Sequence, residues 1–187
     1  MKIAVASDLH LEFGDLYFDN SDHADVLILS GDICVAADIG RPDPHGILES
    51  ARSNRIVDFF KRCSFQFPHV IYILGNHEHY HGDVATTYNI IKSMLESNML
   101  SNVYLLDNEI KQIDDVTFIG GTLWTDMNNQ DPITLLHMKG MMNDFRCVKN
   151  GNRVTIFKDE DGKFHKRESR FTPEDTVEDH KEMLAYI

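Results

Sequence analysis

The chain contains 187 residues, of which 42% are hydrophobic and 26% charged, values typical of a soluble globular protein. Its 30 acidic residues outnumber the 18 Lys and Arg residues, which gives a net charge of −12. This balance argues against a broad nucleic-acid-binding face, because affinity for the phosphate backbone comes mainly from Lys and Arg. The length favours one domain spanning residues 1–187.

Cysteine usage and the start of the chain bear on its location. Cys34, Cys63 and Cys147 are odd in number, widely spaced and free of any C-x-x-C pair, so a disulfide scaffold is not expected. Five uncharged residues, 3–7, precede the charged Asp8, and this run is too short for the apolar core of a signal peptide. No later apolar run approaches the length of a membrane span. We therefore expect a soluble cytoplasmic protein with no membrane partner.

The first half of the chain predicts a parallel sheet. Near-continuous apolar runs at residues 3–6, 26–29 and 70–74 are typical of strands buried on both faces. Residues 41–46 break the chain, and residues 47–63 then carry apolar side chains at mostly helical spacing. This segment predicts a crossover helix that returns the chain to the third strand.

The second half is predicted element by element. The pattern indicates a helix at residues 84–97, a strand at 103–106, a β-hairpin formed by 109–113 and 116–120, a short helix within 127–149, a strand at 153–158 and a charged turn at 159–163. A last helix is expected to start with Thr172 as its N-cap, Pro173 in its first position and Asp175 completing a capping pattern. Its expected apolar face is Val177, His180, Leu184 and Ile187.

Metal-ligand side chains follow each of the three apolar runs. They are Asp8 and His10 after the first run, Asp32 after the second, and Asn76, His77 and Glu78 after the third. Because the carboxyl ends of parallel strands meet at one edge of a sheet, we expect all of them in one cleft. Carboxylate, imidazole and amide donors together suit a pair of divalent metal ions and a phosphate ester.

The three motifs also resemble those of a known family. Asp8-x-His10, Gly31-Asp32 and Gly75-Asn76-His77-Glu78, in this order, are similar to motifs of the calcineurin-like metallophosphoesterase superfamily. The run from Gly120 to Asp126 is similar to a segment of its small bacterial and phage members. The resemblance implies an α/β fold, an α/β/α sandwich of two mixed sheets, here lacking the C-terminal strands.

The resemblance also implies roles for the site residues. Asp8 and His10 would bind the first of two divalent metal ions, Asp32 would bridge both, and Asn76 would bind the second. His77 would face the scissile phosphate as a proton donor or electrostatic stabiliser, and Glu78 would orient it or tune its charge as part of the catalytic set. Manganese is the metal we expect first, with iron, zinc or nickel as alternatives.

The implied activity is hydrolysis of a phosphodiester or phosphomonoester by a hydroxide that two metal ions activate. The family's later ligands, a His after a later strand and a Gly-His-x-His motif, have no match among His137, His165 and His180. We therefore interpret the chain as truncated at its C-terminus, with self-association or the missing segment covering the sheet. Two alternatives stay open: a nuclease of the same superfamily, and a catalytically impaired binding or scaffold domain.

Several other residues have two interpretations. His79 and His81 could contact phosphate, but a solvated loop is favoured for both. For His180, a semi-buried position with a hydrogen-bond partner is favoured over a ligand role. Asp126 and residues 143–146 could line the cleft or form a surface turn. Trp124 is expected in the core or in the cleft wall.

Overall fold

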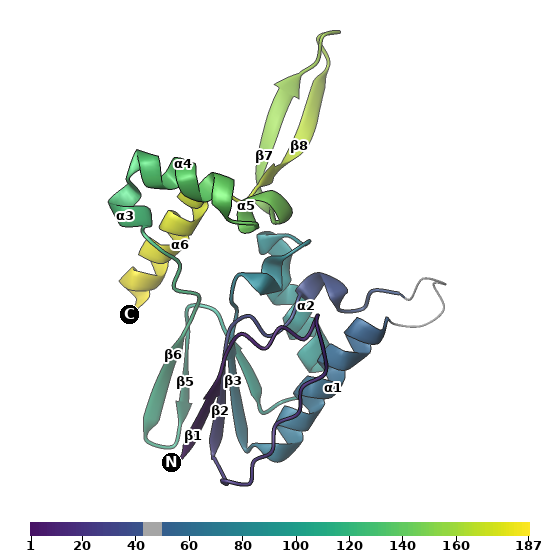
Figure 1. The fold of residues 1–187 in the computed structure, drawn as a ribbon, viewed down its shortest axis with the longest axis vertical. Coiled ribbons are helices and arrows are strands. Elements are labelled where there is room, and N and C mark those ends of the chain that lie inside the picture. Colours follow the sequence, from purple (N-terminus) through teal and green to yellow (C-terminus); the bar gives the residue numbers. More distant parts are fainter. Residues whose placement is uncertain (43–49) are drawn as a thin grey trace.

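A four-stranded parallel sheet organises the molecule (Figure 1). The structure is a computed structural model that describes residues 1–42 and 50–187. The strands follow one another across the sheet in chain order: β1 (Ile3–Ala6), β2 (Val26–Ser30), β3 (His69–Ile73) and β4 (Val103–Leu106). All three neighbouring pairs are parallel, as the apolar runs predicted.

The register of the strands brings their carboxyl ends to one edge. Ala6 pairs with Leu29, Leu29 with Tyr72, and Tyr72 with Leu105, so these four residues form one row across the sheet. The loops that leave the first three strands therefore start side by side. This alignment is what allows residues far apart in sequence to share a site.

Two crossover helices cover one face of the sheet. Helix α1 (Ala51–Gln66) is capped by the side chain of Ser50, and α2 (Val84–Ser97) by that of Asp83. Helix α2 has the predicted bounds. The first crossover helix begins later than predicted and continues to Gln66, while residues 47–49 of that prediction lie outside the described residues. Aromatic and aliphatic side chains of both helices pack with the sheet to form the main core.

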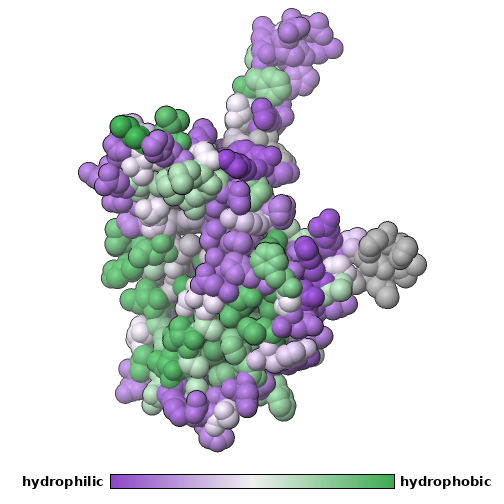
Figure 2. Space-filling view, viewed as in Figure 1, coloured by the Kyte–Doolittle hydropathy of each residue, from purple (hydrophilic) through white to green (hydrophobic). Residues whose placement is uncertain are grey.

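An antiparallel hairpin, β5 (Glu109–Ile113) and β6 (Val116–Gly120), lies on the other face. It forms a smaller core with β2, β3 and β4. Val5 on β1 and Ile110 and Ile119 of the hairpin are exposed, so the prediction that β1 is buried on both faces was wrong. Figure 2 shows apolar residues gathered on the surface of the sheet-containing part of the molecule. What covers this apolar surface, a second copy or another segment, stays a prediction.

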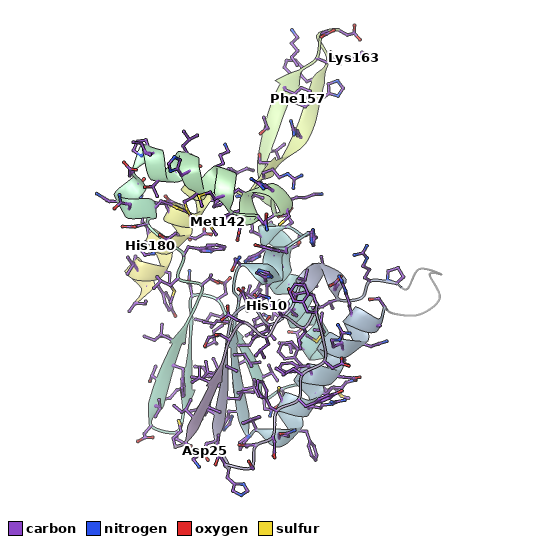
Figure 3. The ribbon with its side chains drawn as sticks, viewed as in Figure 1. His10, Asp25, Met142, Phe157, Lys163 and His180 are labelled. Carbon is purple, nitrogen blue, oxygen red and sulfur yellow. The ribbon has the colours of Figure 1, made fainter. Side chains whose placement is uncertain are left out.

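The last third of the chain forms a layer above the carboxyl edge of the sheet (Figure 1). Its elements are α3 (Met127–Gln130), α4 (Pro132–Met141), α5 (Asp144–Cys147), β7 (Lys149–Lys158), β8 (Phe164–Arg170) and α6 (Pro173–Tyr186). A separate core of Met127, Phe145, Val148, Phe171 and Val177 holds the layer together. The β7–β8 hairpin projects away from the body, with Phe157 and Lys163 near its far end (Figure 3).

Two predictions for this layer need correction. Strand β7 begins at Lys149 and not at residue 153, and β8 was not predicted. In α6 the capping box of Thr172 and Asp175 is present, as predicted. The buried apolar residues of this helix are Pro173, Val177 and Met183, while Leu184 and Ile187 of the expected apolar face are exposed. No helix among the described residues has the length and apolar character needed to cross a bilayer.

Candidate metal centre

The loops after β1 and β2 bring Asp8, His10 and Asp32 together. One potential ligand atom from each of these side chains lies within 4.8 Å of the others. Backbone hydrogen bonds join the two loops, from the His10 amide to the Asp32 carbonyl at 3.0 Å and from the Asp8 amide to the Gly31 carbonyl at 3.1 Å. The three predicted ligands of the first metal therefore form one cluster.

All three of these residues have a left-handed backbone. Their φ angles are +55° at Asp8, +48° at His10 and +56° at Asp32. Non-glycine residues adopt this conformation at a cost of about 1–3 kcal/mol each, and such residues concentrate at functional sites. The strained backbone turns the side chains of the first two loops toward a common point.

A pair of glycines permits the close approach of the second and third loops. Gly31 has φ +86°, and a Cβ atom placed there would lie 2.8 Å from the Cα of Gly75. A Cβ atom on Gly75 would collide with the side chain of Asp32. Both motifs thus need glycine, and the position of Asp32 depends on it.

The Glu78 side chain joins the loops after β2 and β3 through hydrogen bonds. Its carboxylate is fully buried and accepts hydrogen bonds from the amides of Asp32 (3.0 Å), Ile33 (2.7 Å) and Gly75 (2.7 Å) and from the hydroxyl of Tyr72 (2.7 Å). Burial raises the pKa of Glu78, and the hydrogen bonds from Tyr72 and the backbone oppose that rise. Glu78 thus positions the ligand loops. Its hydrogen-bond partners among the described residues do not include His77, and the catalytic role expected for Glu78 stays a prediction.

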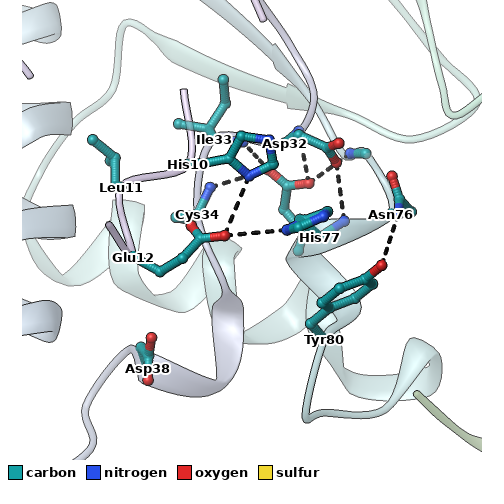
Figure 4. A network of polar contacts seen from close by, with 12 residues as sticks. His10, Leu11, Glu12, Asp32, Ile33, Cys34, Asp38, Asn76, His77 and Tyr80 are labelled. Atoms are coloured by element: carbon teal, nitrogen blue, oxygen red, sulfur yellow. Dashed lines mark hydrogen bonds and ion pairs between the residues drawn. The ribbon is translucent and has the colours of Figure 1, made fainter. Parts of the chain in front are cut away.

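The carboxylate that contacts His77 belongs to Glu12 (Figure 4). Glu12 Oε1 lies 3.1 Å from His77 Nδ1 and 3.2 Å from His10 Nδ1. A carboxylate oxygen only accepts, so each imidazole directs its Nδ1 proton toward Glu12 and keeps Nε2 for another partner. Sequence reasoning missed Glu12, although its spacing of two from His10 was the available signal.

Asn76 and His77 lie next to the cluster. The backbone amide of His77 donates to Asp32 Oδ1 at 2.9 Å. Asn76 Nδ2 donates to the hydroxyl of Tyr80 at 3.3 Å, which leaves the amide oxygen of Asn76 for a metal. The Tyr80 ring stacks on His77 with centroids 4.1 Å apart, and its hydroxyl donates to Asp144 at 3.1 Å.

A cleft of about 330 Å³ opens over these residues. Asp8, Asp32 and Asn76 line it, and residues 121–124 form another part of its wall. His180 Nδ1 lies 2.6 Å from the Trp124 carbonyl and holds this wall in place. His180 therefore has the semi-buried position with a hydrogen-bond partner that was favoured, and Trp124 lies in the cleft wall.

The remaining histidines lie elsewhere. His81 is exposed, as predicted, but His79 is 8% exposed, so its placement in a solvated loop was wrong. Burial lowers the pKa of His79 to about 4, with Asp144 and Asp83 opposing the shift. His137 is exposed on α4, and His165 pairs with Asp159 on the projecting hairpin.

Residues 143–146 divide between the core and the surface. Asp144 and Phe145 are buried, whereas Arg146 is exposed and donates to the carbonyl of Gly140. Asp126 is exposed at the start of α3. These positions favour structural roles over contact with a phosphate.

The donor set fits a divalent metal ion. Two carboxylates and one imidazole around a common point are ligands that manganese, iron, zinc and nickel all accept. Carboxylates commonly orient a metal-binding histidine through its other ring nitrogen, and Glu12 contacts His10 in this way. The buried Oε2 of Glu12 has no hydrogen-bond partner among the described residues. The only other metal-sized cluster in the described parts of the chain is His10, Glu12 and His77, which overlaps the first.

The parallel sheet, its strand-end ligands and its crossover helices define a metallophosphoesterase fold. The chain belongs to the calcineurin-like phosphoesterase family, whose family model matches residues 1–184. The resemblance of the three motifs is thereby confirmed, as is the fold class.

Two individual proteins are also similar to the chain. An uncharacterized protein of Acanthamoeba polyphaga mimivirus is 27% identical over 170 residues, covering 82% of this chain and 54% of that protein. A crystal structure of the phosphopantetheinyl hydrolase of Mycobacterium tuberculosis superposes with a TM-score of 0.54 at 15% identity, covering 79% of this chain and 54% of that one. The chain thus spans about half the length of either protein, and the second likeness supports the fold alone.

Proposed function

We propose that this chain is a metal-dependent phosphoesterase that hydrolyses a phosphodiester or a phosphomonoester. The observation that carries the proposal is the cluster of Asp8, His10 and Asp32 at the carboxyl edge of the sheet. Family membership supports the same general chemistry. A cleft beside the cluster gives a substrate access to it.

Asp8, His10 and Asp32 would hold the first divalent metal ion, and Asp32 with Asn76 would offer ligands to a second. Bound metal ions supply Lewis acidity, which lowers the pKa of a water molecule and neutralises charge on the phosphate. We propose two metal ions, with manganese as the first choice. The second position has fewer ligands from this chain, because His137, His165 and His180 belong to no metal-sized cluster in the described residues.

His77 would act on the substrate directly. Its Nδ1 is occupied by Glu12, so Nε2 is the atom left to donate a proton to the departing oxygen. The Glu12 carboxylate would orient the imidazole for this role. Stacking on Tyr80 and the backbone hydrogen bond to Asp32 fix where the ring lies.

The second candidate is a binding domain with an impaired site, favoured by the small number of ligands for a second metal. The two functions differ in measurable ways. After loading with manganese and dialysis, the enzyme should retain two metal ions per chain and hydrolyse bis(p-nitrophenyl) phosphate. One metal ion per chain or none, together with no turnover, would establish the impaired binding domain instead.

A further inference from the structure

A second cavity adjoins the metal cleft. It has a volume of about 280 Å³ and shares three lining residues with the cleft, namely Leu74, Thr122 and Trp124. Its other walls come from His79, from Phe171 and from the acidic face of α6. A substrate whose phosphate lies at Asp8 and Asp32 would therefore reach this cavity by passing Trp124.

The described residues that line the cavity carry more negative than positive charge. Asp107, Asp179 and Glu182 line it, and none of these three carboxylates forms an ion pair among the described residues. Among the described residues that line the cavity, Arg153 is the one Lys or Arg, and it pairs with Asp175. The pKa of Asp179 is raised to about 6, first by burial and then by the neighbouring charges of Glu182, Asp107 and Glu178, while Arg153 opposes the rise. A positively charged group entering the cavity would relieve this repulsion.

A buried imidazole and aromatic faces also line the cavity. His79 is 8% exposed, and its Nδ1 has no hydrogen-bond partner in the parts of the chain that the structure describes. Trp124 stacks loosely on His79 at 6.4 Å and tilts against Phe171 at 5.3 Å. Aromatic faces with nearby carboxylates are the usual environment for an organic ammonium group.

The spacing of the carboxylates argues against an inorganic ion. Among the described residues, no three ligand atoms in this cavity approach within 4.8 Å of one another, as they do around His10. A metal ion needs such convergence, whereas a substituted ammonium ion is larger and binds through diffuse charge and ring faces. The cavity volume also suits a group of several carbon atoms.

We propose that this second cavity binds the positively charged amine of a phosphoester substrate, so that the substrate is an ester of phosphate with an amino alcohol. The inference rests on the proposed function, since the phosphate is assigned to the metal cleft. Such a substrate has a negative phosphate, which is attracted to the metal-loaded cleft, and a positive amine, which is attracted to the acidic cavity. Trp124 separates the two binding positions.

Two chromogenic diesters of equal size test the proposal. One is p-nitrophenyl phosphorylcholine, and the other is 3,3-dimethylbutyl p-nitrophenyl phosphate, in which an uncharged tert-butyl group replaces the trimethylammonium group. We expect kcat/KM of the manganese-loaded enzyme to be about tenfold higher for the choline ester. The double variant Asp107→Asn, Asp179→Asn should bring the two values within about twofold by lowering kcat/KM for the choline ester alone. Glu174→Gln, which removes an exposed charge of α6 outside the cavity, should retain the preference.

Binding can be measured without turnover because Trp124 is the only tryptophan of the chain. Choline alone should change its fluorescence in the wild type and in Glu174→Gln, but not in the double variant. A protein that binds choline yet hydrolyses neither ester would retain the cavity and lose the proposed function. Equal turnover of both esters with no fluorescence response to choline would overturn the cavity assignment and leave the phosphoesterase intact.

Discussion

Glu12 Oε1 lies 3.1 Å from Nδ1 of His77, and the same oxygen lies 3.2 Å from Nδ1 of His10. One carboxylate therefore orients a proposed metal ligand and the proposed proton donor together (Figure 4). The Glu12 side chain is 9% exposed, so solvent screens these contacts little. In the proposed function, Glu12 would therefore link metal binding by His10 to proton transfer by His77.

Glu12→Gln should lower both the affinity for manganese and kcat by about ten- to a hundredfold. The substituted amide can donate to an imidazole nitrogen, so it no longer selects the tautomer that leaves Nε2 free on His10. Manganese affinity by calorimetric titration and kcat on bis(p-nitrophenyl) phosphate measure the two effects. Asp19→Asn, an exposed change in the same loop, is the matched control and should leave both values unchanged.

A role for Glu12 in folding alone would give a different pattern. In that case Glu12→Gln would lower the melting temperature while the metal affinity and kcat of the folded fraction stayed at wild-type values. That result would remove Glu12 from the site.

His77→Gln should affect substrates according to their leaving groups. A proton donor matters little for p-nitrophenolate, which leaves readily, and contributes about 10²–10⁴-fold for a more basic leaving oxygen. We expect the phenyl ester to lose far more rate than the p-nitrophenyl ester of the same phosphate. Equal losses on both esters would assign His77 to charge stabilisation. Metal affinity should not change, because His77 is not a proposed ligand.

Gly75→Ala should disrupt the metal centre through one added methyl group. Its Cβ atom would collide with the side chain of Asp32, whose Oδ1 also accepts the backbone amide of His77. Overpacking of this kind costs about 1–3 kcal/mol and would displace the proposed bridging ligand. Gly14→Ala, where no heavy atom lies within 4 Å of the new Cβ, is the control. Calorimetric manganese titration of both variants tests this, and equal affinities would refute the packing argument.

His79 should make the protein sensitive to acid. Burial lowers its pKa from 6.5 to about 4 in the folded state, so above pH 6.5 it is neutral in both states. As the pH falls from 6.5 toward 4, the unfolded chain binds a proton that the folded chain excludes, and the free energy of unfolding decreases. The loss approaches about 1.4 kcal/mol per pH unit within this window.

Urea unfolding of the wild type and of His79→Phe at pH 7.5, 6 and 5 measures this term. Comparison with the variant cancels the other titrating groups, including Asp179. The wild type should lose more stability than His79→Phe as the pH falls. Parallel pH dependence in the two proteins would show that His79 takes up its proton without cost.

The sheet and the metal cluster could be predicted because both depend on local patterns. Each of the first three strands is a short apolar run, and the ligands follow directly at its carboxyl end. Parallel pairing then brings Asp8 and Asp32 together without further information. Residues 84–97 and the hairpin 109–120 likewise have the periodicity of the elements they form.

What could not be predicted depends on contacts between distant segments. The burial of His79 results from packing against Trp124 and the C-terminal layer, which no local pattern encodes. Strand β8 is polar and charged, and it pairs with β7 on a projecting hairpin without a buried face to impose alternation. In α6, Met183 is buried and the expected Leu184 is exposed. This shift of one residue depends on the surface of the protein against which the helix packs.

Manganese-dependent turnover of bis(p-nitrophenyl) phosphate by the wild type and by Asp32→Ala tests whether Asp8, His10 and Asp32 form a working metal centre. We expect a rate that rises and saturates with manganese in the wild type and stays at the uncatalysed level in the variant, because the cluster of Asp8, His10 and Asp32 is broken. Turnover by Asp32→Ala equal to that of the wild type, or no manganese-dependent turnover by either protein, would contradict this expectation.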